Sequence, residues 1–177
     1  MEWILLILIL VADQISKYVI AANAAHFANL EIIPGFFYLT YVKNTGAAWS
    51  MLAGKRVLLS LIAAAAIAGM LWFLQKARKE RNYLTMYALV LMIAGAAGNL
   101  IDRLMLGYVR DFLHFFPFGY DFPVFNVADM SLCIGVGLLI LSTVLEKDEP
   151  EGTSEKQKRP EFSEKVMEPE KNRTGVE

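Results

Sequence analysis

Apolar residues along the chain gather in four long stretches that shorter polar segments separate. These stretches cover about residues 3–22, 57–74, 83–100 and 127–145. Each is close to the roughly 20 residues that a helix needs to cross the hydrocarbon core of a membrane. In lipid a helix can satisfy its own backbone hydrogen bonds, so the pattern predicts an α-helical integral membrane protein built as a four-transmembrane-helix bundle.

The first stretch could also be read as a cleaved signal peptide. Ala22-Asn23-Ala24 resembles a small-residue cleavage site. However, no basic residue precedes Trp3, and the charged residues Asp13 and Lys17 interrupt the end of the apolar run. We therefore expect residues 3–22 to remain as the first membrane span.

Basic residues indicate how the spans are oriented. The loop at residues 75–82 contains four basic residues and one acidic residue, the densest basic cluster next to any span. The positive-inside rule places this loop in the cytoplasm, together with both termini. Residues 23–56 and 101–126 then lie on the outer side of the membrane. Lys55 and Arg56 argue weakly for the opposite orientation.

The C-terminal segment, residues 146–177, differs sharply in composition from the rest. It holds 7 basic and 10 acidic residues, whereas residues 1–145 hold 10 basic and 8 acidic residues. A segment with so little apolar content cannot offset its ordering entropy by burial, so we predict a disordered cytoplasmic tail. Residues 1–145 are the predicted membrane domain.

Composition also excludes several kinds of function. The near-neutral charge lacks the basic stripe of a nucleic-acid-binding protein. The single cysteine, Cys133, excludes a disulfide framework or a multi-thiolate metal site within one chain. The two histidines, His26 and His114, are far apart in the sequence. We therefore expect no metal centre and no cofactor.

Polar residues that are costly in lipid recur near the outer membrane face. Asp, Lys and Arg at a helix centre each cost about 2.5 to 3.5 kcal/mol, so they need partners or a wet cavity. Four segments that arrive from both directions place such groups at a similar depth, which predicts a site there. The residues are Asp13 and Lys17 in the first span, Asn44 in the first outer segment, Asn99, Asp102 and Arg103 at the end of the third span, Asp111 in the second outer segment, and Asn126 and Asp129 at the start of the fourth span.

Several of these residues also have plain structural interpretations. Asp13 and Lys17 are four positions apart, as in an ion pair along one helix face. Asp102 next to Arg103 at a helix end is typical of an interfacial ion pair. The spacing of these four residues therefore leaves a structural role and a functional role open.

The start of the fourth span has the same ambiguity. Asn126 followed three residues later by Asp129 is a helix-capping pattern. Yet two carboxylates held close together cannot both ionise easily, so such a pair shares a proton and can activate water. The residues best suited to this chemistry are Asp111 and Asp129, although spacing alone does not bring them together.

Five short motifs resemble the lipoprotein signal peptidase family, the signal peptidase II group of bacterial membrane aspartyl proteases. They occur in the order of that family and span residues 3–145. The motifs are Asp13-Gln14-Ile15-Ser16-Lys17, Asn44-Thr45-Gly46-Ala47-Ala48-Trp49-Ser50, GAAGNLIDR at residues 95–103, Val109-Arg110-Asp111-Phe112, and Phe125-Asn126-Val127-Ala128-Asp129. Each motif is weak alone, but five in order are specific.

The resemblance implies an aspartic endopeptidase of the bacterial cytoplasmic membrane. Because two carboxylates can carry out this hydrolysis by themselves, we expect no metal, and a site within one chain needs no partner subunit. Its substrates would be prolipoproteins whose cysteine carries diacylglycerol, cut just before that cysteine. Asp111 and Asp129 would be the catalytic dyad. The residues implied to bind substrate or support the site are Asp13, Lys17, Asn44, Asn99, Asp102, Arg103 and Asn126.

The resemblance also implies a small outer β-cradle and a short outer helix or lid. Residues 36–42 are aromatic and β-branched, as a strand requires. The lid would lie around residues 103–120. Ala94 stands where the family often has glycine, a change we expect only to tighten packing.

One alternative comes from another class of protein. A proton-coupled transporter or channel subunit would also carry intramembrane Asp and Lys residues. A transport pathway needs polar positions at both depths, and the inner halves of the second and fourth spans show only Ser142 and Thr143. The polar pattern therefore favours the peptidase.

Overall fold

The structure is a computed structural model that describes residues 1–47 and 51–147. This part of the chain contains four long helices, each apolar enough to cross a membrane. The predicted four-helix membrane bundle is thereby confirmed. The helices are α1 (Glu2–Ala22), α2 (Arg56–Lys79), α3 (Tyr83–Met105) and α4 (Val127–Lys147). Residues 48–50 of the second motif and 148–177 of the predicted disordered tail lie outside the described residues.

Helix α3 is the central helix of the bundle and packs against α1, α2 and α4. Half of its most apolar window is buried, against about a fifth or less for the other three helices. The outer faces of α1 and α2 instead expose large apolar side chains such as Leu8 and Leu61, as lipid-facing surfaces require. A buried cluster between α2 and α3, centred on Leu74 and Val90, fills the half of the bundle nearest their connecting turn.

Glycines in α3 and α4 allow the helices to approach closely. A Cβ atom at Gly95 would clash with the backbone carbonyl of Ala128 and the side chain of Leu132 on α4. A Cβ at Gly98 would lie 2.5 Å from a carboxylate oxygen of Asp13 on α1. Small residues at these positions therefore bring α1 and α4 against the end of α3 that carries Asn99 and Asp102.

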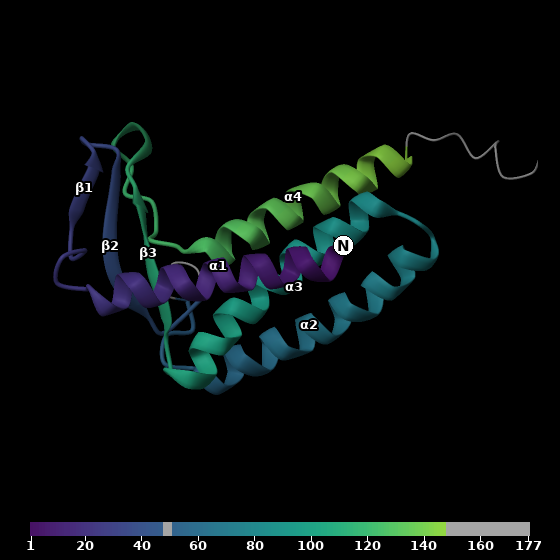
Figure 1. Ribbon diagram of the computed structural model, residues 1–177, viewed down its shortest axis with the longest axis horizontal. Helices are drawn as coiled ribbons and strands as arrows, with labels where there is room; N and C mark the ends of the chain where they lie inside the picture. The colour runs from purple at the N-terminus through teal and green to yellow at the C-terminus, as the bar shows by residue number, and fades with distance from the viewer. Residues whose placement is uncertain (48–50, 148–177) are drawn as a thin grey trace, which may run out of the picture.

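A three-stranded antiparallel sheet stands across one end of the bundle (Figure 1). Its strands are β1 (Leu30–Ile33), β2 (Phe37–Asn44) and β3 (Val109–Phe115), in that order. The predicted strand at residues 36–42 corresponds to β2. Strand β3 was not predicted, and it joins the second outer segment to the first by pairing Val42 with Asp111.

The ends of two helices differ from the expected spans. Helix α2 continues to Lys79, past the predicted end at residue 74, and α3 continues to Met105, past residue 100. Polar residues at a bundle end can extend a helix into the interface, where they meet water. The expected lid segment, around residues 103–120, begins with the last turn of α3. Beyond α3, the described residues of this segment contain one helical element, the short 3-10 helix η2 (Pro117–Gly119).

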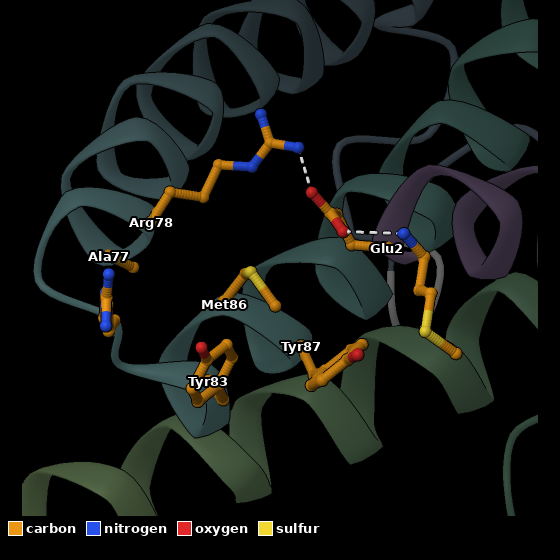
Figure 2. Close-up of a pocket in the computed structure, with 8 residues that line it drawn as sticks. Glu2, Ala77, Arg78, Tyr83, Met86 and Tyr87 are labelled. Carbon is orange, nitrogen blue, oxygen red and sulfur yellow. Dashed lines mark hydrogen bonds and ion pairs between the residues drawn. The ribbon is translucent and has the colours of Figure 1, made fainter.

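The opposite end of the bundle holds the start of α1 and the α2–α3 turn. Arg78 at the end of α2 forms an ion pair with Glu2 at the start of α1 (Figure 2). The same guanidinium lies 5.1 Å from the ring centroid of Trp3, a cation–π contact. These contacts fix α1 to α2 at the end of the molecule farthest from the sheet.

Candidate active site

Two carboxylates meet where the sheet joins the helix bundle. Asp111 lies on β3, and Asp129 lies in the first turn of α4. Asn126 contacts both of them. Its side-chain Nδ2 donates to Oδ1 of Asp111 at 2.6 Å, and its backbone N–H donates to Oδ2 of Asp129 at 3.1 Å. Asn126 therefore links two acids that are 18 positions apart in the sequence, one through its side chain and the other through its backbone.

Asn126 also caps helix α4. Its Oδ1 accepts a hydrogen bond from the backbone N–H of Asp129 at 3.0 Å, while the Asp129 carboxylate accepts from the Asn126 backbone. This reciprocal pattern is a capping box. The capping interpretation of the sequence is confirmed, and the same two hydrogen bonds fix the position of the Asp129 carboxylate.

In each acid, a second amide group donates to the carboxylate oxygen that Asn126 does not contact. Asn44, at the end of β2, donates from Nδ2 to Oδ2 of Asp111 at 2.9 Å. Asn99 on α3 donates from Nδ2 to Oδ1 of Asp129 at 2.7 Å. Asn amides are neutral, so they orient a carboxylate without supplying a full counter-charge. Asn44 also accepts from the backbone N–H of Gly46, the turn that its sequence predicted.

Lys17 is a fully buried cation next to this group. Its Nζ forms an ion pair with Asp13 at 2.9 Å, lies 3.9 Å from Asp102, and donates to Oδ1 of Asn99 at 2.9 Å. The predicted pair of Asp13 with Lys17 is therefore present, with both side chains 0% exposed. A buried charge needs such partners because its desolvation costs several kcal/mol.

Asp13 also connects α1 to the start of α4. Its Oδ1 accepts a hydrogen bond from the backbone N–H of Ala128 at 2.9 Å. Ala128 is one of the helix residues between Asn126 and Asp129. The buried ion pair on α1 and the capping box on α4 are thus parts of one connected network.

The environment of Asp111 favours its protonated form. Burial is the main cause, and the nearby charge of Asp129 adds to it, while hydrogen bonds from Asn44 and Asn126 act in the opposite direction. Together they raise the pKa of Asp111 from 3.8 to about 6. A carboxyl group with this pKa can give or take a proton close to neutral pH, as general acid–base chemistry requires.

The chain matches the family model described as Signal peptidase (SPase) II over residues 5–145. The chain belongs to the signal peptidase II family. It is therefore a membrane protease, and the family resemblance inferred from the five motifs is confirmed.

Curated members of the signal peptidase II family are similar over most of their length. The lipoprotein signal peptidase of Symbiobacterium thermophilum is 47% identical over 142 residues, which are 80% of this chain and 93% of the relative. That of Bacillus subtilis strain 168 is 40% identical over 144 residues, 81% of this chain and 93% of the relative.

Two solved structures share the fold. Both are bacterial membrane enzymes studied by the in meso method, at 2.3 Å and 1.9 Å resolution. The first has a TM-score of 0.77 at 36% identity and covers 85% of this chain and 92% of its own. The second has a TM-score of 0.72 at 38% identity, covering 83% and 93%. This agreement confirms a multi-pass bacterial membrane protein.

The expected ion pair between Asp102 and Arg103 is not formed. Adjacent helix residues point about 100° apart, so the two side chains reach different neighbours. Asp102 faces Lys17, whereas the Arg103 guanidinium donates to the backbone carbonyl of Gly46 at 2.9 Å and reaches that of Asn99 at 3.5 Å. Arg103 thus connects the end of α3 to Gly46, in the segment between β2 and α2, by a hydrogen bond.

Sequence reasoning assigned no role to Arg110 or Gln14, although both lie within the quoted motifs. Arg110 donates from Nη2 to Asp102 at 2.7 Å and from its backbone N–H at 2.9 Å, and its Nη2 also donates to Gln14 at 3.0 Å. The alternation of side chains between the two faces of a β-strand could have indicated that Arg110 contacts a different group of residues from Asp111. If Asp111 faces one side of the strand, Arg110 faces the other.

The buried ionic groups of the described residues share one end of the bundle. They are Asp13, Lys17, Asp102 and Asp111. Toward the other end, the buried polar residues are hydroxyl-bearing: Ser131 donates to the Leu91 carbonyl at 2.7 Å, and the hydroxyls of Ser142 and Thr85 are 2.7 Å apart. This distribution gives a transport pathway no support. Within the described residues, no three His, Cys, Asp or Glu side chains come together in a group that could hold a metal ion.

Proposed function

We propose that this protein removes the signal peptide from diacylglyceryl-modified prolipoproteins, with Asp111 and Asp129 as an aspartic catalytic dyad. The relatives named above are lipoprotein signal peptidases. The observation that carries the proposal is that Asn126 hydrogen-bonds both carboxylates at the end of a membrane bundle. The cleaved bond would be the peptide bond just before the lipid-modified cysteine.

In the proposed reaction the dyad carries one shared proton. The ionised carboxylate takes a proton from water as the water oxygen attacks the scissile carbonyl carbon. The protonated carboxyl donates its proton to the carbonyl oxygen, so that a neutral tetrahedral diol forms. Collapse of the diol breaks the C–N bond. As this bond breaks, the ionised carboxylate takes a proton from a hydroxyl of the diol, and the protonated carboxyl donates its proton to the leaving nitrogen. The pair again carries one proton.

The remaining site residues would keep the dyad in position. Asn44, Asn99 and Asn126 orient the carboxylates through their amide groups. Lys17 neutralises its acidic partners, so a buried cation is available without pairing directly with the dyad. The other supporting residues are Asp13, Asp102 and Arg103, which tie α1, α3 and the β2–α2 segment together.

We further propose that the dyad lies at the extracytoplasmic face and that both termini are cytoplasmic. The basic residues Lys76, Arg78, Lys79 and Arg81 lie at the bundle end opposite the sheet, which supports this orientation. A substrate anchored by its acyl chains would then reach the dyad from the surrounding lipid. One chain supplies every residue of the site, so a monomer would suffice.

The decisive experiment uses two matched substrates. Purified protein is incubated with a diacylglyceryl-modified pre-lipoprotein and with its unmodified form, and cleavage is followed by gel mobility. Only the lipidated form should be cut. Asp111→Asn and Asp129→Asn should each lower the rate by at least about 100-fold, the usual weight of a general acid or base. Both variants should still insert into membranes.

Asp121→Asn is the matched control. Asp121 is an exposed carboxylate that pairs with His114 at 2.7 Å, outside the network described above. This variant should keep wild-type activity. Near-full activity of either dyad variant would refute the dyad, and equal cleavage of both substrates would refute the lipidated-substrate proposal.

The dyad mechanism also predicts how chelators act. Because the proposed chemistry uses carboxylates alone, EDTA should leave the cleavage rate unchanged in a buffer without added metal. The measurement is the initial rate before and after chelation. Strong inhibition that added divalent metal reverses would contradict a metal-independent mechanism.

A further inference from the structure

A hollow lies at the end of the bundle opposite the dyad. The start of α1, the end of α2 and the start of α3 line a half-open cavity of about 350 Å³ (Figure 2). Its walls include the rings of Tyr83 and Tyr87, with Met86 between them in the sequence. Tyrosine is enriched at membrane–water interfaces, where one end of its side chain is apolar and the other is wet.

The charges around this cavity do not balance. Arg78 is paired with Glu2, whose carboxylate also lines the cavity, and Lys76 is paired with Glu80 at 3.8 Å. Lys79 and Arg81 remain. Among the residues whose side chains the structure describes (1–47 and 51–145), no carboxylate forms an ion pair with either cation. The first turn of α3 adds the partial positive charge of a helix N-terminus. Arg81 lines the cavity, and Lys79 follows the lining residue Arg78 in the sequence, so the described residues at the cavity carry a surplus of positive charge.

Arg81 occupies a backbone position that normally favours glycine. Helix α2 ends in a Schellman motif, in which the Arg81 N–H donates to the Arg78 carbonyl at 3.2 Å and the Asn82 N–H to the Ala77 carbonyl at 3.0 Å. This motif places Arg81 in the left-handed region, with φ of 57°. An arginine with this backbone conformation is strained, and Arg81 is one of the residues that line the cavity.

We propose that this cavity binds the head group of an anionic glycerophospholipid of the phosphatidylglycerol type. Arg81 would bind the phosphate and Lys79 would add charge at the rim. The lipid, rather than a soluble phosphate, is favoured because α2, which lines the cavity with Ala77 and Arg78, also exposes the large apolar side chains of Trp72 and Phe73. Acyl chains could lie against these side chains. The proposal is independent of the catalytic assignment.

Lipid binding is measured by native mass spectrometry of the full chain in a neutral detergent. Phosphatidylglycerol and phosphatidylcholine with the same acyl chains are compared. Wild-type protein should prefer phosphatidylglycerol, and Arg81→Gln should reduce that preference about fivefold, the weight of one cation at a membrane surface. Lys55→Gln, which removes an exposed cation at the other end of α2, should leave the preference unchanged.

Arg81→Gly distinguishes a loss of lipid binding from a loss of stability. Glycine relieves the strained φ, so without lipid this variant should unfold at a higher temperature than wild type while losing the preference for phosphatidylglycerol. Equal retention of the two lipids by wild type would overturn the proposal, as would an unchanged preference in Arg81→Gln. Displacement of the lipid by millimolar inorganic phosphate would also overturn it, because the cavity would then be a site for soluble anions.

Discussion

Each carboxylate of the proposed dyad is held by neutral amides, while the nearby buried cation is held by other acids. Asp111 accepts from Asn44 and Asn126, whereas Lys17 pairs with Asp13. A direct ion pair with lysine would lower the pKa of a carboxyl group and remove it from acid–base work near neutral pH. The Asn amides instead fix the geometry of the Asp111 carboxyl group and still allow burial to raise its pKa.

The raised pKa of Asp111 predicts a pH-dependent stability. Burial raises this pKa from 3.8 to about 6, so the folded protein binds the proton more tightly than the unfolded chain does. The stabilisation is full below pH 3.8 and is lost as the pH rises through about 6. The shift corresponds to about 3 kcal/mol, since one pKa unit is worth 1.36 kcal/mol.

This effect can be measured by comparing wild type with Asp111→Asn. The apparent unfolding temperature of each protein in detergent is recorded from pH 4 to 8. Because asparagine does not titrate, the unfolding temperature of wild type should fall relative to that of Asp111→Asn as the pH rises through about 6. A difference that is constant across this range would mean that Asp111 titrates normally.

At the scale of elements, the approach of α4 to α3 decides where Asp129 lies. Gly95 on α3 faces the carbonyl of Ala128, the residue just before Asp129. A side chain at this position would push the start of α4 away from α3. The capping box would then move relative to Asn99 and Asp111, which lie on other elements.

Gly95→Ala should therefore weaken both stability and activity. Overpacking of this kind typically costs about 1 to 3 kcal/mol, and a lower unfolding temperature should accompany a lower cleavage rate. Gly137→Ala is the matched control on α4, because a Cβ atom there meets nothing within 4 Å. If both variants behave alike, close packing at Gly95 does not position the site.

At the scale of the whole molecule, the sheet and the α2–α3 turn lie at opposite ends of the bundle (Figure 1). Tyr120, beside the sheet, is exposed, and so is Lys79 at the other end. The proposed orientation places the first outside the cytoplasm and the second inside it.

Cysteine labelling tests this orientation in a Cys133→Ala background. A membrane-impermeant maleimide should label Tyr120→Cys in intact spheroplasts, whereas Lys79→Cys should react only after permeabilisation. Cleavage activity of both variants confirms that they are folded. The reverse labelling pattern would invert the topology and place the dyad at the cytoplasmic face.

Local sequence was sufficient for the spans and for the set of polar residues. A run of about 20 apolar residues must be helical in lipid, whatever its neighbours are, so four helices followed from the pattern alone. The strand at Phe37–Asn44 was also visible in its aromatic and β-branched residues. The cost of placing Asp13 or Lys17 in lipid marked them in advance as residues that need partners.

Tertiary structure decided which polar groups meet. Strand β3 was missed because charged residues interrupt its apolar pattern, and its partner β2 lies far away in the sequence. The contact of Asp102 with Arg110 depends on where β3 lies against α3. The contact of Asn126 with Asp111 depends on the close approach of α4 to α3, which Gly95 and Gly98 permit. Hydrogen bonds form over a few tenths of an ångström and narrow angles, and only the packed bundle sets atoms to that accuracy.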